Sequence, residues 1–217
     1  RLNPKTKLHT LGTAYESDID FFSAEKYPEL NIAAKSYPYV YLSKQAPEYV
    51  FAGEGTVQKE LAVFYAPINQ FNSGKIQWKT LCKTSDKLIG SAILNGKIYA
   101  ITHKNSKNYK LIATDLENPN WDNATTIVEE KDMSLKSAIV CKDYLLLIYN
   151  DGINSHVYRY NPKTKSIDKV ELPFGGTANL QNIDKETNEF LVRITSWNKP
   201  ATEFFYNAKT GSFTNSP

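Results

Sequence analysis

Histidine is the side chain best suited to proton transfer near neutral pH, and the chain contains three: His9, His103 and His156. Each lies in or beside an expected strand or hairpin. None is accompanied by serine, cysteine or aspartate at a spacing that indicates a catalytic set. We therefore interpret all three as structural or surface residues.

A serine nucleophile of the hydrolase type sits in the strained turn G-x-S-x-G, and this pattern is missing from the sequence. The two glycine–serine pairs, Gly90-Ser91 and Gly211-Ser212, lack the second glycine. We assign no catalytic residue to this chain.

Three further motifs have an ordinary interpretation beside a functional one. Glu129, Glu130 and Asp132 could bind a cation or act as an acid/base pair, but a solvated loop is the favoured interpretation. The Gly-Glu-Gly sequence at 53–55 lacks the Gly-Lys-Ser/Thr end of a phosphate-binding loop and is interpreted as an irregular connection. Asn123 begins an Asn-Ala-Thr glycosylation pattern, which arises often by chance.

The two cysteines, Cys82 and Cys141, are 59 positions apart (141 − 82 = 59), and neither has a cysteine or histidine at metal-ligand spacing. We therefore expect no metal site and no cofactor. One disulfide or two free thiols remain open, so cysteine usage does not determine the compartment. We expect a cytoplasmic protein, with a periplasmic or secreted location left open.

The charge balance argues against nucleic acid as a partner. The chain has 26 basic and 23 acidic residues, a net charge of 26 − 23 = +3. Only Arg1, Arg159 and Arg193 supply the guanidinium fork that reads guanine edges and phosphates. No apolar run approaches the ~20 residues that span a bilayer, so we expect no membrane partner.

The elements that must position these residues are strands. Aromatic and β-branched residues fall in runs of four to seven, bounded by Asn, Gly, Pro and Lys, and no segment has a sustained helical period. The predicted strands include 39–42, 61–65, 98–102, 111–114, 144–149, 157–160, 190–195 and 204–206. The fold class is therefore all-β and antiparallel, with hairpin turns at Asn95-Gly96, Asp151-Gly152 and 161–165.

A repeat indicates how these strands are grouped. The turn YNPKTKSI at 160–167 recurs as YNAKTGSF at 206–213 and as LNPKTKL at 2–8. Aligned turn positions Asn69, Asp115, Asn161 and Asn207 give spacings of 115 − 69 = 46, 161 − 115 = 46 and 207 − 161 = 46. Four short strands repeated every 40 to 50 residues, roughly, are typical of propeller blades.

We therefore predict a partial β-propeller over 1–217, with about four four-stranded antiparallel blades. The predicted parts are the end of a preceding blade at 1–10, an insertion at 11–28, blades at 29–83, 84–131 and 132–174, and an incomplete last blade at 175–217. Most propellers need more blades to close. Because the chain starts at Arg1 without an initiator methionine, we expect a piece of a longer protein.

Three segments resemble the propeller of the prolyl oligopeptidase family. LHTLGTAYESDIDFF at 8–22 is similar to the family's H-x-L-G-T-x-x-x-x-D segment, and NYKLIATDLENPNW at 108–121 to its Y-R-L-x-x-x-D-x-x-x-P segment. The stretch 170–211 resembles the blade LP-x-x-G-x-V…E-x-F-x-x-x-T-S-F-x-x-P-x-x-I-Y-x-x-D-x-x-T-G. Trp197 stands where the family usually has Phe, and Asn207 where it usually has Asp. Oligopeptidase B shares the Leu-Gly-Thr segment, so the subfamily is open, and the Thr-Ser-Trp…Pro blade favours prolyl oligopeptidase.

The resemblance implies a function for the parent protein. In that family a seven-bladed propeller covers an α/β-hydrolase peptidase domain, which carries the catalytic residues and follows the propeller. This chain would be the C-terminal half of the propeller, a gate that admits short proline-containing peptides to a serine peptidase. No propeller residue is carried over as a substrate contact.

The alternative is a non-enzymatic propeller that binds a protein or peptide on its face. A propeller enzyme with its own metal or acid/base site would need inward-facing sets of His or carboxylate, and three scattered histidines speak against it. An open arc of blades leaves uncovered sheet faces and edges, so we also expect self-association of the isolated chain.

Overall fold

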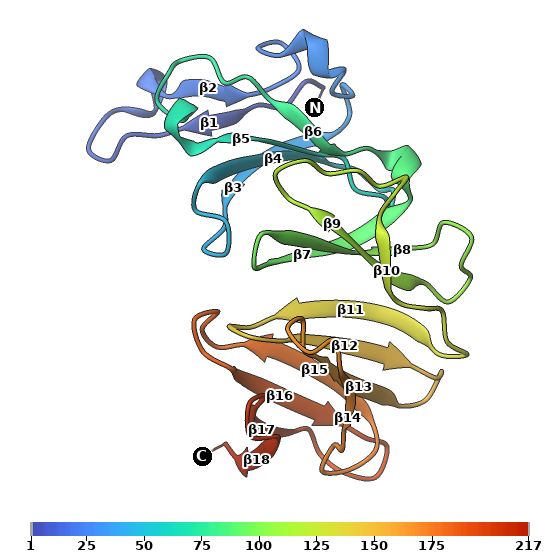
Figure 1. The fold of residues 1–217 in the computed structure, drawn as a ribbon. Helices are drawn as coiled ribbons and strands as arrows, with labels where there is room; N and C mark the ends of the chain where they lie inside the picture. Colours follow the sequence, from blue (N-terminus) through green and yellow to red (C-terminus); the bar gives the residue numbers. More distant parts are fainter. Residues whose placement is uncertain (1, 217) are drawn as a thin grey trace. The chain divides into compact units, whose positions relative to one another are not determined.

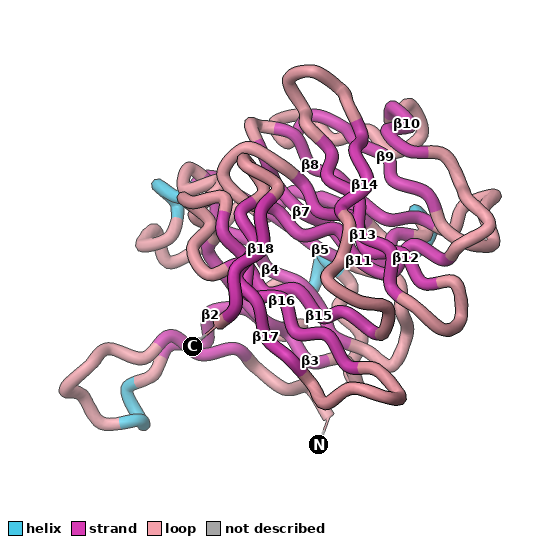
Figure 2. Tube along the Cα trace, turned by 90° about the horizontal axis from the view of Figure 1, so that it is seen from below, coloured by secondary structure: helices cyan, strands magenta, loops and turns pink. Residues whose placement is uncertain are grey.

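The computed structural model describes residues 2–216, which fold into strands joined by turns (Figures 1 and 2). The chain divides into two compact units, 1–88 and 89–217, each described by itself. The helical elements among the described residues are three-residue turns, far short of the length and hydrophobicity of a membrane-spanning helix.

The first unit contains a hairpin and one four-stranded sheet. Its elements are β1 (Thr6–Leu8), η1 (Tyr15–Ser17), β2 (Ile19–Phe22), η2 (Pro28–Leu30), β3 (Tyr37–Leu42), β4 (Tyr49–Gly55), β5 (Val63–Pro67), η3 (Ile68–Gln70), β6 (Lys79–Cys82) and η4 (Thr84–Asp86). The sheet order is β3-β4-β5-β6, and β1 pairs with β2. One buried cluster, which includes Phe22, Tyr27, Val50 and Phe64, packs the hairpin segment against one face of the sheet.

The second unit contains three four-stranded sheets, each a meander of sequential antiparallel strands. Their strands are β7 (Leu88–Leu94), whose first residue belongs to the first unit, β8 (Lys97–Thr102), β9 (Lys110–Asp115), β10 (Thr125–Val128), β11 (Ser134–Val140), β12 (Leu145–Asn150), β13 (Ser155–Tyr160), β14 (Ile167–Val170), β15 (Thr177–Asn182), β16 (Glu189–Thr195), β17 (Thr202–Asn207) and β18 (Ser212–Asn215). The orders are β7-β8-β9-β10, β11-β12-β13-β14 and β15-β16-β17-β18.

Both faces of the middle sheet are buried. One face, with Leu135, Leu145 and Leu147, packs against the β7–β10 sheet, and the other, with Leu146 and Ile148, packs against the β15–β18 sheet. A strand that is buried between two apolar layers consists almost entirely of apolar residues. This explains the uninterrupted apolar sequence Leu145–Tyr149. The partial propeller of about four four-stranded antiparallel blades is thus confirmed.

The repeat has a local physical cause. In the turn after β13, Asn161 Oδ1 accepts the backbone N–H groups of Lys163 and Thr164 at 2.9 and 3.4 Å. After β17, Asn207 Oδ1 accepts the N–H groups of Lys209 and Thr210 at 2.9 and 3.2 Å. The same side-chain-capped turn therefore reverses the chain before the fourth strand of both sheets.

Two expectations from the sequence are corrected. The Gly-Glu-Gly sequence at 53–55 is no irregular connection but the end of strand β4, paired with β3. A Cβ at Gly53 would lie 2.5 Å from the hydroxyl oxygen of Tyr39 on β3 and 3.0 Å from the carbonyl oxygen of Ala62, so a larger residue here would require the Tyr39 ring to move. The last blade was predicted to be incomplete, whereas the β15–β18 sheet has four strands, because Ser212–Asn215 pairs along β17.

The predicted insertion at 11–28 contains strand β2, which pairs with β1.

Candidate functional site

Three loops of the second unit emerge at one end of its last two sheets. In a meander of antiparallel strands, the connection from second to third strand and the exit from the fourth strand lie at the same end. The loops are 151–154 between β12 and β13, 171–176 between β14 and β15, and 196–201 between β16 and β17. We call these three segments the loop platform.

Backbone contacts hold the three loops together. The N–H of Ser155 donates to the carbonyl of Gly176 at 2.8 Å, and the buried Ser155 hydroxyl accepts the N–H of Ala178 at 3.0 Å. A Cβ at Gly176 would overlap the carbonyl oxygen of Thr195, so the backbone of loop 171–176 lies directly against the end of β16. The glycine of the LP-x-x-G motif therefore permits this close approach.

A cation–π contact joins two of the loops on their outer side. Lys199 Nζ lies 4.7 Å from the centroid of the Phe174 ring. That ring also packs edge-on against Phe204 of β17, with centroids 6.1 Å apart. Loop 196–201 is therefore attached to the core through Phe174.

The platform presents apolar side chains to solvent. Trp197 has 101% and Ile153 70% of its reference area exposed. Exposed tryptophan is enriched in protein interfaces, where it commonly contributes much of the binding energy. The loop platform is therefore suited to contact with another protein surface.

A histidine–carboxylate pair lies beside the platform. His156 Nε2 is 2.7 Å from Asp151 Oδ2, while Asp151 Oδ1 accepts the backbone N–H groups of Ile153 and Asn154, both at 2.8 Å. The N–H of Asn154, followed by His156 and the N–H of Ile153, holds the pKa of the Asp151 carboxyl well below its usual range. The carboxylate therefore organises the turn and orients the imidazole.

The pair does not form part of a serine triad. Ser155 is next to His156 in β13, and successive side chains of a strand point to opposite faces. Its hydroxyl is also engaged by the N–H of Ala178. The pair was missed in the sequence; the available signal was a spacing of five positions (156 − 151 = 5) across the Asp151-Gly152 turn.

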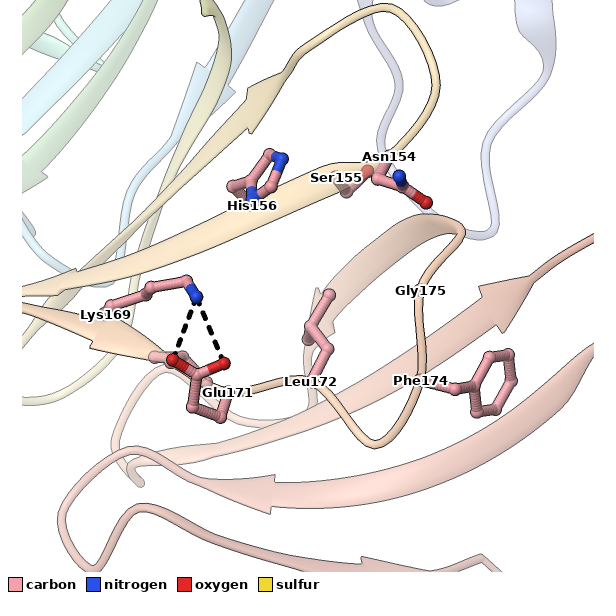
Figure 3. Close-up of a pocket in the computed structure, with 9 residues that line it drawn as sticks. Asn154, Ser155, His156, Lys169, Glu171, Leu172, Phe174 and Gly175 are labelled. Atoms are coloured by element: carbon pink, nitrogen blue, oxygen red, sulfur yellow. Dashed lines mark hydrogen bonds and ion pairs between the residues drawn. The ribbon is translucent and has the colours of Figure 1, made fainter.

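A pocket of about 230 Å³ opens between β13, β14 and loop 171–176 (Figure 3). Its lining combines the apolar side chains of Leu172 and Phe174 with the polar groups of Asn154, His156 and the Lys169–Glu171 pair. The Lys169 Nζ lies 2.9 Å from Glu171 Oε1. This mixture can hold a peptide segment, and the one lining residue with a hydroxyl group, Ser155, accepts the N–H of Ala178.

The other residues singled out in the sequence have structural surroundings. His9 Nδ1 lies 2.7 Å from Asp18 Oδ1, so the histidine and aspartate of the H-x-L-G-T-x-x-x-x-D segment close the loop between β1 and β2. The ring of His103 contacts that of Tyr109, with centroids 6.2 Å apart. Glu130 accepts the backbone N–H of Asn108.

The cysteines and the acidic cluster offer no metal site among residues 2–216. Cys82 and Cys141 are free and buried. Burial raises the pKa of the Cys82 thiol to about 12 and also raises the pKa of Cys141. Asn123 lies exposed in the loop before β10.

The repeated four-stranded sheets, packed face to face and bearing loops at one end, define the β-propeller class. Within that class, residues 1–215 match the family described as "Prolyl oligopeptidase, N-terminal beta-propeller domain". The chain belongs to this family. The resemblance of the three sequence segments is thereby confirmed.

Two curated relatives are peptidases by name. The chain is 26% identical over 200 residues to "Dual function macrocyclase-peptidase POPB" of Galerina marginata, covering 89% of this chain and 26% of the relative. It is 24% identical over 209 residues to "Prolyl endopeptidase" of Elizabethkingia meningoseptica, covering 96% and 28%. The chain therefore spans little more than a quarter of each of these relatives.

Solved structures support the same fold. The structure of prolyl oligopeptidase B from Galerina marginata as apo protein has a TM-score of 0.77 at 21% identity, covering 99% of this chain and 30% of that one. Oligopeptidase B from Trypanosoma brucei has a TM-score of 0.74 at 13% identity, covering 97% and 30%. At these identities the likeness concerns the fold alone.

Proposed function

We propose that this chain is the substrate-gating propeller portion of a prolyl oligopeptidase-like serine peptidase that cleaves short peptides after proline. The observation that carries the proposal is the family match over 1–215. The relatives named as prolyl endopeptidase and macrocyclase-peptidase are consistent with it. The chain itself contributes no bond chemistry in this proposal, and catalysis belongs to a peptidase domain elsewhere in the parent.

We further propose that the peptidase domain of the parent covers the loop platform. Trp197 and Ile153 are too exposed to contribute to the packing of the sheets, so covering them is favourable. Strand β18 ends at the same side, where Asn215 is paired with Phe204 and Ser216 donates its N–H to Glu203. The backbone therefore leaves the sheet beside loop 196–201.

In this arrangement the propeller acts by exclusion. A closed chamber limits substrates by size and removes bulk water around the reacting peptide, which strengthens the electrostatic contacts of the peptidase site. The gate thus contributes to specificity and to the environment of the reaction, whereas bond cleavage depends on the other domain.

The first test is hydrolysis by the full-length parent. We expect cleavage of a short proline-containing peptide, no cleavage of the same sequence inside a folded protein, and labelling of the parent by a serine-directed phosphonate. A parent that is neither labelled nor active on the peptide, but binds a protein or peptide, would instead be the non-enzymatic binding module.

The second test concerns the loop platform. Trp197→Ala should leave the folding of this chain unchanged, because the side chain is fully exposed. In the parent we expect Trp197 to be protected from acrylamide quenching, and Trp197→Ala to increase cleavage of peptides that are normally too long. Equal quenching in the chain and in the parent would contradict a covered platform.

A further inference from the structure

One lysine of the middle sheet occupies an unusual position in its strand. Leu135 of β11 pairs with Tyr149, and Ser137 pairs with Ile148, the next partner along β12. Lys136 lies between them without a partner, in a β-bulge. A bulge interrupts the alternation of side chains and redirects the extra residue.

Lys136 reaches solvent past the edge of the sheet. Both faces of the β11–β14 sheet are covered by the neighbouring sheets of the unit. Yet Lys136 is exposed, and its strand β11 is the first strand and one edge of the sheet. The free edge of β11 is therefore the direction in which its side chain meets water.

This edge is the side on which the sheets converge. Strand β11 lies against β15, the first strand of the following sheet, and against β8 of the preceding one. In a propeller, sheets arranged around a central channel are closest at their inner edges. An exposed side chain on the first strand of a sheet whose two faces are both covered, such as Lys136, therefore points to the channel wall.

The wall formed by the second unit carries one kind of charge. The exposed side chains on the first strands of its first two sheets are Ser91 of β7 and Lys136 of β11, whereas those of β15 alternate with buried Ala178 and Leu180 and lie on the uncovered face of the last sheet. Neither Ser91 nor Lys136 is a carboxylate. Lys136 makes no ion pair with another described residue. An unpaired ammonium group on such a wall attracts carboxylates and repels cations.

We propose that Lys136 is a charge-selecting residue of the channel, which favours peptides bearing a carboxylate, either a Glu or Asp side chain or a free C-terminus. The proposal rests on the proposed function, because it concerns the peptides that the gate admits. Lys136 is a selecting residue and takes no part in bond cleavage.

The experiment compares matched peptides in the full-length parent at low salt. One pair of prolyl peptides differs by Glu against Gln, and a second pair by a C-terminal acid against an amide. We expect kcat/KM to favour the carboxylate member by about three- to fivefold, as one partly screened charge pair allows. Lys136→Gln should bring the ratio close to one, Lys136→Arg should retain it, and Lys136→Glu should invert it.

A matched control is Lys185→Gln, which removes an exposed lysine from the turn between β15 and β16. It should leave both ratios unchanged, and added salt should reduce them in the wild type. The two pairs show which carboxylate is recognised. Ratios near one in the wild type, or ratios that survive Lys136→Gln, would overturn the proposal while leaving peptidase activity intact.

Binding separates failure of this proposal from failure of the proposed function. Fluorescence anisotropy with the same four labelled peptides measures affinity without turnover. If the parent cleaves none of the peptides, the proposed function fails, and the affinity ratios in wild type and Lys136→Gln still decide the role of the lysine.

Discussion

The two thiols of the chain illustrate how burial suppresses chemistry at the scale of a residue. Cys141 Sγ lies 3.4 Å from the carbonyl oxygen of Tyr144 and 3.3 Å from Asn188 Oδ1, both of which accept a hydrogen bond from a protonated thiol. Removal from water raises the pKa of Cys82 to about 12 and raises the pKa of Cys141. Because the thiolate is the reactive species, both cysteines are protected by the fold.

We expect iodoacetamide at pH 8 to modify neither cysteine in the folded chain within minutes, and both in denaturant. Mass spectrometry of intact protein counts the adducts. Rapid modification of the native chain would mean that Cys82 or Cys141 is accessible and ionised, contrary to their burial.

Asp151 is the residue whose ionisation most affects the local turn. Its folded pKa is depressed by the N–H of Asn154, by His156 and by the N–H of Ile153. A depressed carboxyl pKa stabilises the folded chain above the unfolded pKa of about 3.9, and this contribution is lost as pH falls through the lower folded value.

Asp151→Asn should therefore be less stable than wild type at pH 6, and the difference should narrow as pH falls below about 4. Thermal unfolding midpoints at several pH values measure this difference. The carboxyl carbon resonance of Asp151 should titrate below the usual Asp range, and a normal titration would contradict the hydrogen bonds described.

At the scale of elements, the two Asn-capped turns form a natural matched pair. Both end in a residue with left-handed backbone: Lys165 with φ of 60° after β13, and Gly211 with φ of 76° after β17. Glycine adopts this conformation without steric cost, whereas a residue with a Cβ is strained by about 1 kcal/mol.

Lys165→Gly should therefore increase the free energy of unfolding by up to about 1 kcal/mol, and Gly211→Lys should decrease it by a similar amount. Denaturant titration of the second unit's transition measures both. Changes of the same sign would contradict control of these turns by the left-handed backbone conformation.

At the scale of the whole molecule, the outer face of the β15–β18 sheet is uncovered. One row across its strands, Gln181, Leu191, Phe205 and Thr214, contains an exposed aromatic ring. The next row contains Asn179, Arg193 and Glu203, polar side chains that favour contact with solvent. We propose that the isolated chain self-associates through the first row. The association should be weak, because polar side chains flank this row.

Sedimentation velocity across a concentration series should show reversible association of the isolated chain. Phe205→Lys should shift it to the monomer without lowering the unfolding midpoint, because the ring is partly exposed. Unchanged association in this variant would place the contact on another surface.

The sequence by itself determined the features that depend on neighbouring residues. Apolar runs such as 145–149 predicted strands, and the Asn161 and Asn207 turns predicted a repeat of 46, because each turn is capped by its own side chain. Together they were sufficient for the propeller and, through three motifs, for the family.

Only the tertiary structure decided which distant residues meet. The strand at 53–55 was mistaken for a connection because its strand character comes from pairing with β3, a segment distant in the chain. The loop platform depends on Gly176 lying against Thr195, and the exposure of Lys136 depends on a bulge between two covered faces. These arrangements arise from packing between sheets, where contacts join residues far apart in the chain and no local pattern records them.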